Sequence, residues 1–239
     1  MTTPAQAPSP GPTGAAASRV FLLSPANCGG TRAWQVASPR ARFALAEQLR
    51  SNEGAPLGEL FAFMSGLYFR GKLTYARRFA APLGSATPTV EGGVFVITPN
   101  AGLWHPEARV TMATMRSFAS TDVHPENPAY RQPLERSAAT LAVEAGSECE
   151  VVLLGSIASP KYVDVLLEIF GTRLRFPVAF VGRGDMSRGG LLLRRAAAGA
   201  ELEYVPVAGA VRRGARPPKL PPLGRAVEGS RDGGRGDED

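Results

Sequence analysis

Cysteine and histidine are scarce in this chain of 239 residues. The two cysteines, Cys28 and Cys149, lie far apart, and the two histidines, His105 and His124, follow no metal-ligand spacing. Disulfide frameworks and zinc sites both need several such residues at characteristic intervals. The sequence therefore predicts neither. We expect no metal or other cofactor, and the reducing cytoplasm is the expected compartment.

Long apolar runs are missing as well. No stretch approaches the roughly 20 apolar residues that span a membrane, and residues 1–18 contain neither a charge nor an apolar core of signal-peptide length. We expect no membrane segment and no export signal. The ending of a Walker loop is absent, as are the Ser-x-x-Lys and Gly-x-Ser-x-Gly frames, although Ser156 and Lys161 stand close together.

The composition that remains is that of a packed globular protein with a mild positive charge. Hydrophobic residues make up 44% of the chain, and the net charge of +6 permits a nucleic acid or phosphorylated ligand without requiring one. Residues 1–18 are rich in Pro, Ala, Ser and Thr, and residues 214–239 in Pro, Gly and charge. Such segments bury too little apolar surface to fold, so we expect two disordered tails around one domain, 19–213.

Predicted strands and helices alternate through that domain. Apolar Val151–Leu154 is typical of a strand covered on both faces, and Ser159-Pro160 starts a helix that Gly171 closes. This alternation predicts an α/β fold, a three-layer Rossmann-like sandwich around a mostly parallel sheet. The other predicted elements are strands at 20–23, 93–98, 178–181 and 202–207 and helices from Ser38 and over 70–79, 111–118 and 133–145.

Four polar turns follow predicted strands, at 24–32, 98–104, 155–161 and 182–190. Ligands of open α/β sheets bind at the carboxyl ends of strands, so we expect one shared site. Glycines there would expose backbone N–H groups and arginines would hold an anion, although each turn could equally be an ordinary structural one. The candidate ligand-binding residues are Asn27, Cys28, Gly29, Gly30, Arg32, Asn100, Gly102, Gly155, Ser156, Lys161, Gly182, Arg183, Gly184 and Arg188.

Candidates for catalysis are fewer. Asp185 stands among glycines and arginines just before a predicted helix, where it could act as a general base or polar anchor, or simply pair with an arginine. Cys28 as a nucleophile is the weaker hypothesis, because a thiol needs a nearby base and neither histidine can be placed beside it from sequence.

Aromatic and basic residues interleave from Tyr68 to Arg78. Tyr68, Arg70 and Lys72 could together stack a base and hold a nucleic-acid phosphate. The more ordinary interpretation is a helix whose aromatic residues face the core while its arginines face solvent.

Five segments carry a resemblance to known proteins. Across residues 19–213 the chain resembles a family of uncharacterised bacterial proteins and is similar, more weakly, to the uracil-DNA-glycosylase-like domain of archaeal tRNA-modifying enzymes that make archaeosine. The resemblance implies a Rossmann-like fold and a nucleobase context. It gives Asn27 the catalytic place of an acidic or Asn residue in the first loop, whereas the late loop lacks that superfamily's histidine. The segments are LLSPANCGGTRA, LYFRGKLTYARRFA, VFVITPNAGLWHPE, VVLLGSIASPKYVDVL and FVGRGDMSRGGLLLR.

Two hypotheses about function follow. The first is a nucleic-acid- or nucleotide-related protein that acts on a nucleobase or a glycosidic bond. The second is a non-catalytic interaction module that binds nucleic acid or a protein partner through the basic aromatic helix. Whether the chain is an enzyme stays open at this point.

Overall fold

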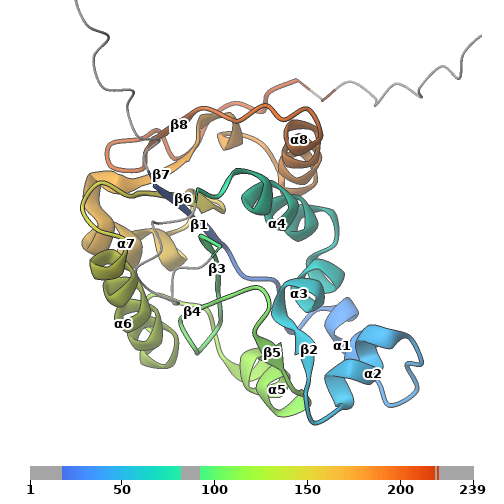
Figure 1. Cartoon of the computed structure of the whole chain (residues 1–239). Coiled ribbons are helices and arrows are strands. Elements are labelled where there is room, and N and C mark those ends of the chain that lie inside the picture. Colours follow the sequence, from blue (N-terminus) through green and yellow to red (C-terminus); the bar gives the residue numbers. More distant parts are fainter. Residues whose placement is uncertain (1–17, 82–91, 219, 221–239) are drawn as a thin grey trace, which may run out of the picture.

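A computed structural model describes residues 18–81, 92–218 and 220. They form a mixed α/β domain around a six-stranded sheet of order β4-β3-β1-β6-β7-β8 (Figure 1). The prediction of a single α/β domain with a mostly parallel sheet is confirmed. The parallel strands are β1 (Arg19–Leu23), β3 (Val94–Ile97), β6 (Glu150–Leu154) and β7 (Leu174–Pro177), and the antiparallel edge strands are β4 (Leu103–Trp104) and β8 (Tyr204–Pro206).

The central strand β1 is buried on both faces. Its side chains alternate, so that Phe21 and Leu23 join one apolar cluster while Val20 and Leu22 join another. The first cluster contains side chains of α3, α4 and α8, and the second contains side chains of α6 and α7. The bounds of these helices are α3 (Leu57–Ser65), α4 (Leu67–Phe79), α6 (Pro128–Glu144), α7 (Pro160–Phe170) and α8 (Asp185–Ala197).

Helices α4 and α8 pack at unusually close range, and glycine allows it. A Cβ atom added at Gly71 would lie 2.6 Å from the carbonyl oxygen of Gly189, and one added at Gly189 would lie 2.7 Å from that of Leu67. The glycines at 189 and 190 therefore belong to a helix. The prediction of one long turn over 182–190 is wrong in its second half, because α8 already begins at Asp185.

Two other predicted elements are wrong. No helix starts at Ser38: this residue ends α1 (Thr31–Ala37), and its hydroxyl accepts a hydrogen bond from the Arg40 N–H in a turn before α2 (Ala44–Arg50). Ser-Pro serves turns as readily as helix starts. The segment Val178–Phe180 is a 3-10 helix rather than a strand. The strand β7 directly precedes it, and its charged residue, Arg175, interrupts the apolar run that would have predicted a strand.

The remaining boundaries follow from local capping. Helix α7 begins after Ser159, whose hydroxyl accepts from the Lys161 N–H, as predicted. Helix α6 begins earlier than predicted because Asn127 caps it and Pro128 occupies its first turn. The predicted basic helix starts at Leu67, after Gly66 with φ of 62°. The other elements are α5 (Met112–Ser120), close to the prediction, and a small sheet of β2 (Ala55–Pro56) and β5 (Arg109–Val110).

Within the described part of the chain, every helix is too short or too polar to span a bilayer. The tail predicted for residues 1–18 lies outside the described residues apart from its last residue, and so does most of the tail predicted for 214–239. Residues 214 and 215 are described, and their backbones run against Gly182.

Candidate functional site

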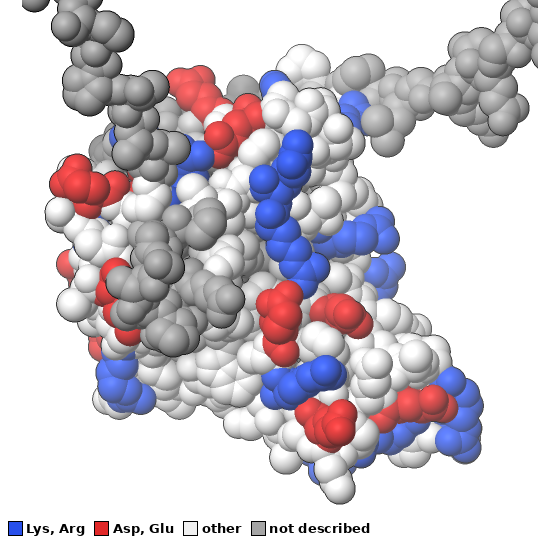
Figure 2. All heavy atoms as spheres, in the orientation of Figure 1, with Lys and Arg blue, Asp and Glu red and all other residues white. Residues whose placement is uncertain are grey.

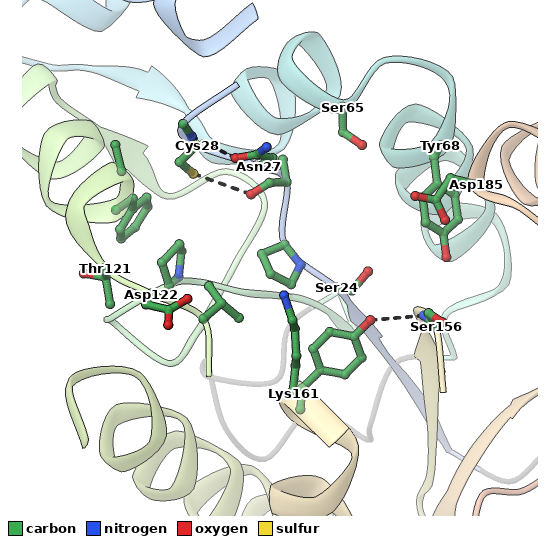
Figure 3. Close-up of a pocket in the computed structure, with 18 residues that line it drawn as sticks. Ser24, Asn27, Cys28, Ser65, Tyr68, Thr121, Asp122, Ser156, Lys161 and Asp185 are labelled. Atoms are coloured by element: carbon green, nitrogen blue, oxygen red, sulfur yellow. Dashed lines mark hydrogen bonds between the residues drawn. The ribbon is translucent and has the colours of Figure 1, made fainter. Parts of the chain in front are cut away.

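A cavity of about 540 Å³ lies at the carboxyl ends of β1 and β6 (Figure 3). The chain leaves β1 to form β3 on one side and later returns to form β6 on the other. Such a switch point between neighbouring parallel strands is where open α/β sheets hold their ligands. The cavity is lined by residues 24–29 after β1, by Ser156 after β6, and by the first turns of α7 and α8. The loop after α5 adds Thr121 and Asp122.

Much of the predicted site therefore does converge. Three of the four predicted turns contribute several residues or a helix start to the cavity, whereas the turn at 98–104 contributes only Pro99. Figure 3 shows hydroxyl, amide and carboxyl groups on different sides of one space. The predicted residues that line it are Asn27, Cys28, Gly29, Tyr68, Ser156, Lys161 and Asp185.

Asn100 and Gly102 are placed elsewhere. The Asn100 amide donates to the carbonyl and hydroxyl of Ser117, at 3.0 and 2.7 Å, and to the Thr121 hydroxyl at 2.8 Å, so it braces the end of α5. Gly102, with φ of 72°, packs against Pro133 and Ser137 inside α6. Both residues hold a loop in place and neither lines the cavity.

The three arginines proposed to hold an anion donate instead to backbone carbonyls. Arg32 donates to Phe63 at 3.4 Å, and Arg183 to Ala179 at 2.9 Å. Arg188 is buried and donates to Phe180 through two nitrogens, at 3.2 and 3.1 Å.

The predicted glycines are partly structural too. Gly30 and Gly184 are the residues before α1 and α8, Gly182 adopts φ of 71°, and none of the three lines the cavity. Asp185 is exposed in the first turn of α8, 3.5 Å from Arg188. It faces the cavity as predicted, but as a helical residue paired with an arginine.

Lys72 is the largest departure from the sequence-based expectation. It is 1% exposed, whereas Arg70 on the same helix faces solvent, because Tyr68, Lys72 and Tyr75 share the inner face of α4. A nucleic acid outside the protein cannot reach Lys72. Its Nζ donates to the Ser24 carbonyl oxygen at 2.6 Å and to the Ser24 hydroxyl at 2.9 Å.

The surroundings of Lys72 disfavour its charged form. Burial lowers the pKa of Lys72 to about 7; Asp185 acts against this shift and Arg188 adds to it. The Nζ atom also lies 4.5 and 4.7 Å from the ring centroids of Tyr68 and Phe69. A buried lysine of this kind is half neutral near physiological pH, which makes it a base.

Three residues with hydroxyl groups lie close together at Lys72: Ser24, Tyr162 and Tyr68. Ser24 is 5% exposed and lines the cavity. Beside it, the Tyr162 oxygen accepts from the Ser156 N–H at 3.1 Å, and burial raises the pKa of Tyr162, while a hydrogen bond with Ser24 opposes the shift. A Cβ atom at Gly155 would lie 2.9 Å from Ser24 Cβ and 3.0 Å from the Tyr162 oxygen. Gly155 therefore makes room for this cluster without lining the cavity.

The third hydroxyl belongs to Tyr68, and it points to a missing polar partner. The oxygen is buried and makes no hydrogen bond of good geometry among the described residues, although the Arg188 guanidinium interacts with it and the side chain lines the cavity. Figure 3 shows the ring directed into the space between Asp185 and Ser156. An unpaired buried hydroxyl is costly, so this position favours a bound polar group.

Cys28 does not have the surroundings of a nucleophile. Burial raises the pKa of the Cys28 thiol to about 12, and its Sγ donates to the Ala26 carbonyl at 3.6 Å. Across the residues that the structure describes, no three His, Cys, Asp or Glu side chains gather in a way that could hold a metal ion.

The sequence did not single out Ser24 or Tyr162, and it gave Lys72 a different role, a contact with a nucleic-acid phosphate. Ser24 directly follows the first predicted strand, and Lys72 stands four residues after Tyr68 and three before Tyr75, on the apolar face of the helix. That spacing was available in the sequence.

Comparison with known proteins adds no identification, since no family model, no curated protein and no solved structure matches this chain.

Proposed function

We propose that this protein is nucleotide- or nucleic-acid-related and binds a nucleobase or nucleoside in the cavity between β1 and β6. The observation that carries the proposal is the convergence of polar turns at that switch point. The volume of about 540 Å³ is in the range of small-molecule pockets. The weak resemblance to a uracil-DNA-glycosylase-like domain supports the same class of ligand.

Two residues at the cavity suit such a ligand. The Asn27 side chain is oriented by the Gly29 N–H, which donates to its Oδ1 at 3.0 Å, and its amide donor can face a base edge. Lys161 is exposed in the first turn of α7, where the helix N-terminus and the ammonium both attract a phosphate.

A groove next to the cavity could hold the neighbouring nucleotides of a nucleic-acid strand. It shares Cys28 and Gly29 with the cavity and exposes Trp34, 73% accessible, whose indole N–H donates to the Gly29 carbonyl at 3.2 Å. An exposed aromatic ring beside a base pocket can stack a flanking base. Figure 2 shows Lys and Arg side chains gathered over the neighbouring helices α4 and α8, where phosphates can make nonspecific contacts.

The second hypothesis, an interaction module built on α4, has less support. Its aromatic half is absent from the surface, because Tyr68 and Tyr75 are buried, and exposed arginines such as Arg70 and Arg78 remain. The Rossmann-like three-layer classification is part of the proposal, supported by helices packed on both faces of β1. So is the cytoplasm, supported by two free buried cysteines.

The proposal is tested by calorimetric titration of purified protein with nucleobases, nucleosides, nucleotides and short oligonucleotides. We expect at least one base or nucleoside to bind, and Asn27→Ala to weaken it roughly tenfold, the effect of one lost hydrogen bond in a site. Asn52→Ala, at an exposed asparagine away from the cavity, is the matched control. Unchanged affinity in the Asn27 variant, or no binding across the panel, would contradict the proposal.

A further inference from the structure

We propose that Ser24 is a nucleophile for acyl transfer, with Lys72 behind it as the general base. The proposal rests on the distance of 2.9 Å between the Lys72 Nζ and the hydroxyl of Ser24, a residue that lines the cavity. This goes beyond the proposed function, because it concerns a reaction and does not depend on which ligand the rest of the cavity holds.

The order of the two residues from solvent inward is that of a nucleophile and its base. Ser24 lines the cavity, whereas Lys72 does not and is almost fully enclosed. A ligand therefore meets the hydroxyl first, and the amine lies directly behind it. An adjacent base within hydrogen-bond reach is what a serine needs to become a nucleophile at neutral pH.

Several charged and titratable groups face Lys72 from the elements packed around it. Tyr68 belongs to the same helix, Ser24 follows β1, and Asp185 and Arg188 come from α8. Tyr162 of α7 lies next to Ser24. The neighbouring Asp185 and Arg188 carry opposite charges and act on Lys72 in opposite directions, so desolvation dominates and a neutral amine is accessible near pH 7.

The lysine also ties down the end of β1, through the Ser24 carbonyl at 2.6 Å. That role alone does not account for the neighbouring hydroxyls. Tyr162 lies beside Ser24, and the buried Tyr68 hydroxyl, which makes no hydrogen bond of good geometry among the described residues and interacts with Arg188, points into the same part of the cavity (Figure 3). Burial raises the pKa of both phenols, so each keeps a proton to donate to a developing oxyanion.

The proposed step balances with the groups present. The Ser24 oxygen attacks the carbonyl carbon of an ester or amide, and its proton moves to neutral Lys72. The tetrahedral oxyanion accepts hydrogen bonds from the tyrosine hydroxyls. Its collapse breaks the bond to the alcohol or amine, which leaves with the proton from Lys72. Water, deprotonated by the same amine, then releases the acid from acyl-Ser24 and restores both residues.

An acyl group suits this site better than a phosphoryl group. Phosphoryl transfer spreads negative charge over several oxygens and relies on clamps of cations. The described cavity lining contains one cationic side chain, Lys161. Acyl transfer develops charge on a single oxygen, for which two hydroxyl donors suffice.

The test is covalent labelling of the full chain by a fluorophosphonate, which traps nucleophilic serines, and by p-nitrophenyl acetate, followed by intact mass and peptide mapping. We expect one adduct per chain, on Ser24, and a labelling rate at least tenfold lower in Ser24→Ala. Ser147→Ala, at an exposed serine in the loop before β6, is the matched control. No adduct with either reagent, or an adduct that persists in Ser24→Ala, overturns the proposal.

The part of Lys72 is tested by the pH dependence of the same reaction. We expect the labelling rate of the wild-type protein to rise with a midpoint near pH 7 and to fall roughly 100-fold in Lys72→Arg, whose side chain stays protonated. A wild-type labelling rate that does not rise between pH 6 and pH 8 overturns the role of Lys72. This outcome can be read even if the Lys72→Arg variant does not fold. Nucleoside binding, measured separately, distinguishes a failure here from a failure of the proposed function.

Discussion

The buried Lys72 gives folding stability a specific dependence on pH. Burial lowers its pKa from the ordinary value of 10.5 to about 7 in the folded protein. Between these values the unfolded chain holds a proton that the folded chain lacks. In this window unfolding takes up a proton, so raising the pH makes unfolding less favourable and stabilises the fold, whereas below pH 7 both states are protonated and the full cost of burying the charge remains.

The size of the effect follows from the two pKa values. Integrated from pH 7 to pH 9, the Lys72 contribution raises the free energy of unfolding by about 2 kcal/mol. Other groups contribute there as well, such as the Cys28 thiol, whose pKa is higher in the folded than in the unfolded chain. Their effects cancel in the difference between the wild-type protein and Lys72→Met. The wild type should thus gain about 2 kcal/mol relative to this variant over two pH units.

Guanidinium unfolding of both proteins at pH 7, 8 and 9, with linear extrapolation to water, measures this difference. Lys161→Met is the matched control, because it removes an exposed lysine, and its curve should run parallel to that of the wild type. Parallel curves for the wild type and Lys72→Met would refute the reasoning, since they would mean that Lys72 keeps its ordinary pKa in the folded state.

Three further predictions concern packing and positioning. Gly189→Ala should lower the free energy of unfolding by more than 1 kcal/mol, because its methyl group would meet α4. Gly190→Ala in the same helix should be neutral or stabilising, because its methyl group would lie 3.7 Å from one leucine. Urea unfolding curves compare the two variants. Gly155→Ala should reduce Ser24 labelling without unfolding the protein, and retained labelling would contradict the crowding described above. Asn100→Ala should lower the melting temperature, because three hydrogen bonds are lost, and should leave ligand affinity unchanged. Weaker binding in this variant would mean that Asn100 belongs to the ligand site after all.

Much of the sheet was predictable because its strands are extreme cases. The runs at 20–23, 94–97 and 151–154 are wholly apolar, since helices cover both faces of the sheet there. Strand β7 was misplaced because Arg175 interrupts it and pairs with Glu150 across the sheet, at 3.3 Å. A charged residue that finds a partner next to its strand breaks the apolar pattern without breaking the strand.

The site was predictable only as far as chain order fixes position. Residues that follow parallel strands meet at one sheet edge, and so Asn27 and Ser156 converge as expected. Arginines were assigned to ligands on charge alone, but a guanidinium has five donors and the nearest acceptors in a folded loop are carbonyls. That is how Arg183 and Arg188 are held, and sequence alone does not say which acceptor is nearest.

Lys72 shows where a physical argument from sequence could have gone further. Its neighbours at one helical turn, Tyr68 and Tyr75, predict a buried face, and a lysine on such a face must find a partner or lose its charge. Ser24 is that partner, and it is 48 residues away in the chain. Helical spacing can therefore identify a buried lysine as a chemically unusual residue, while only the fold names the hydroxyl that it contacts.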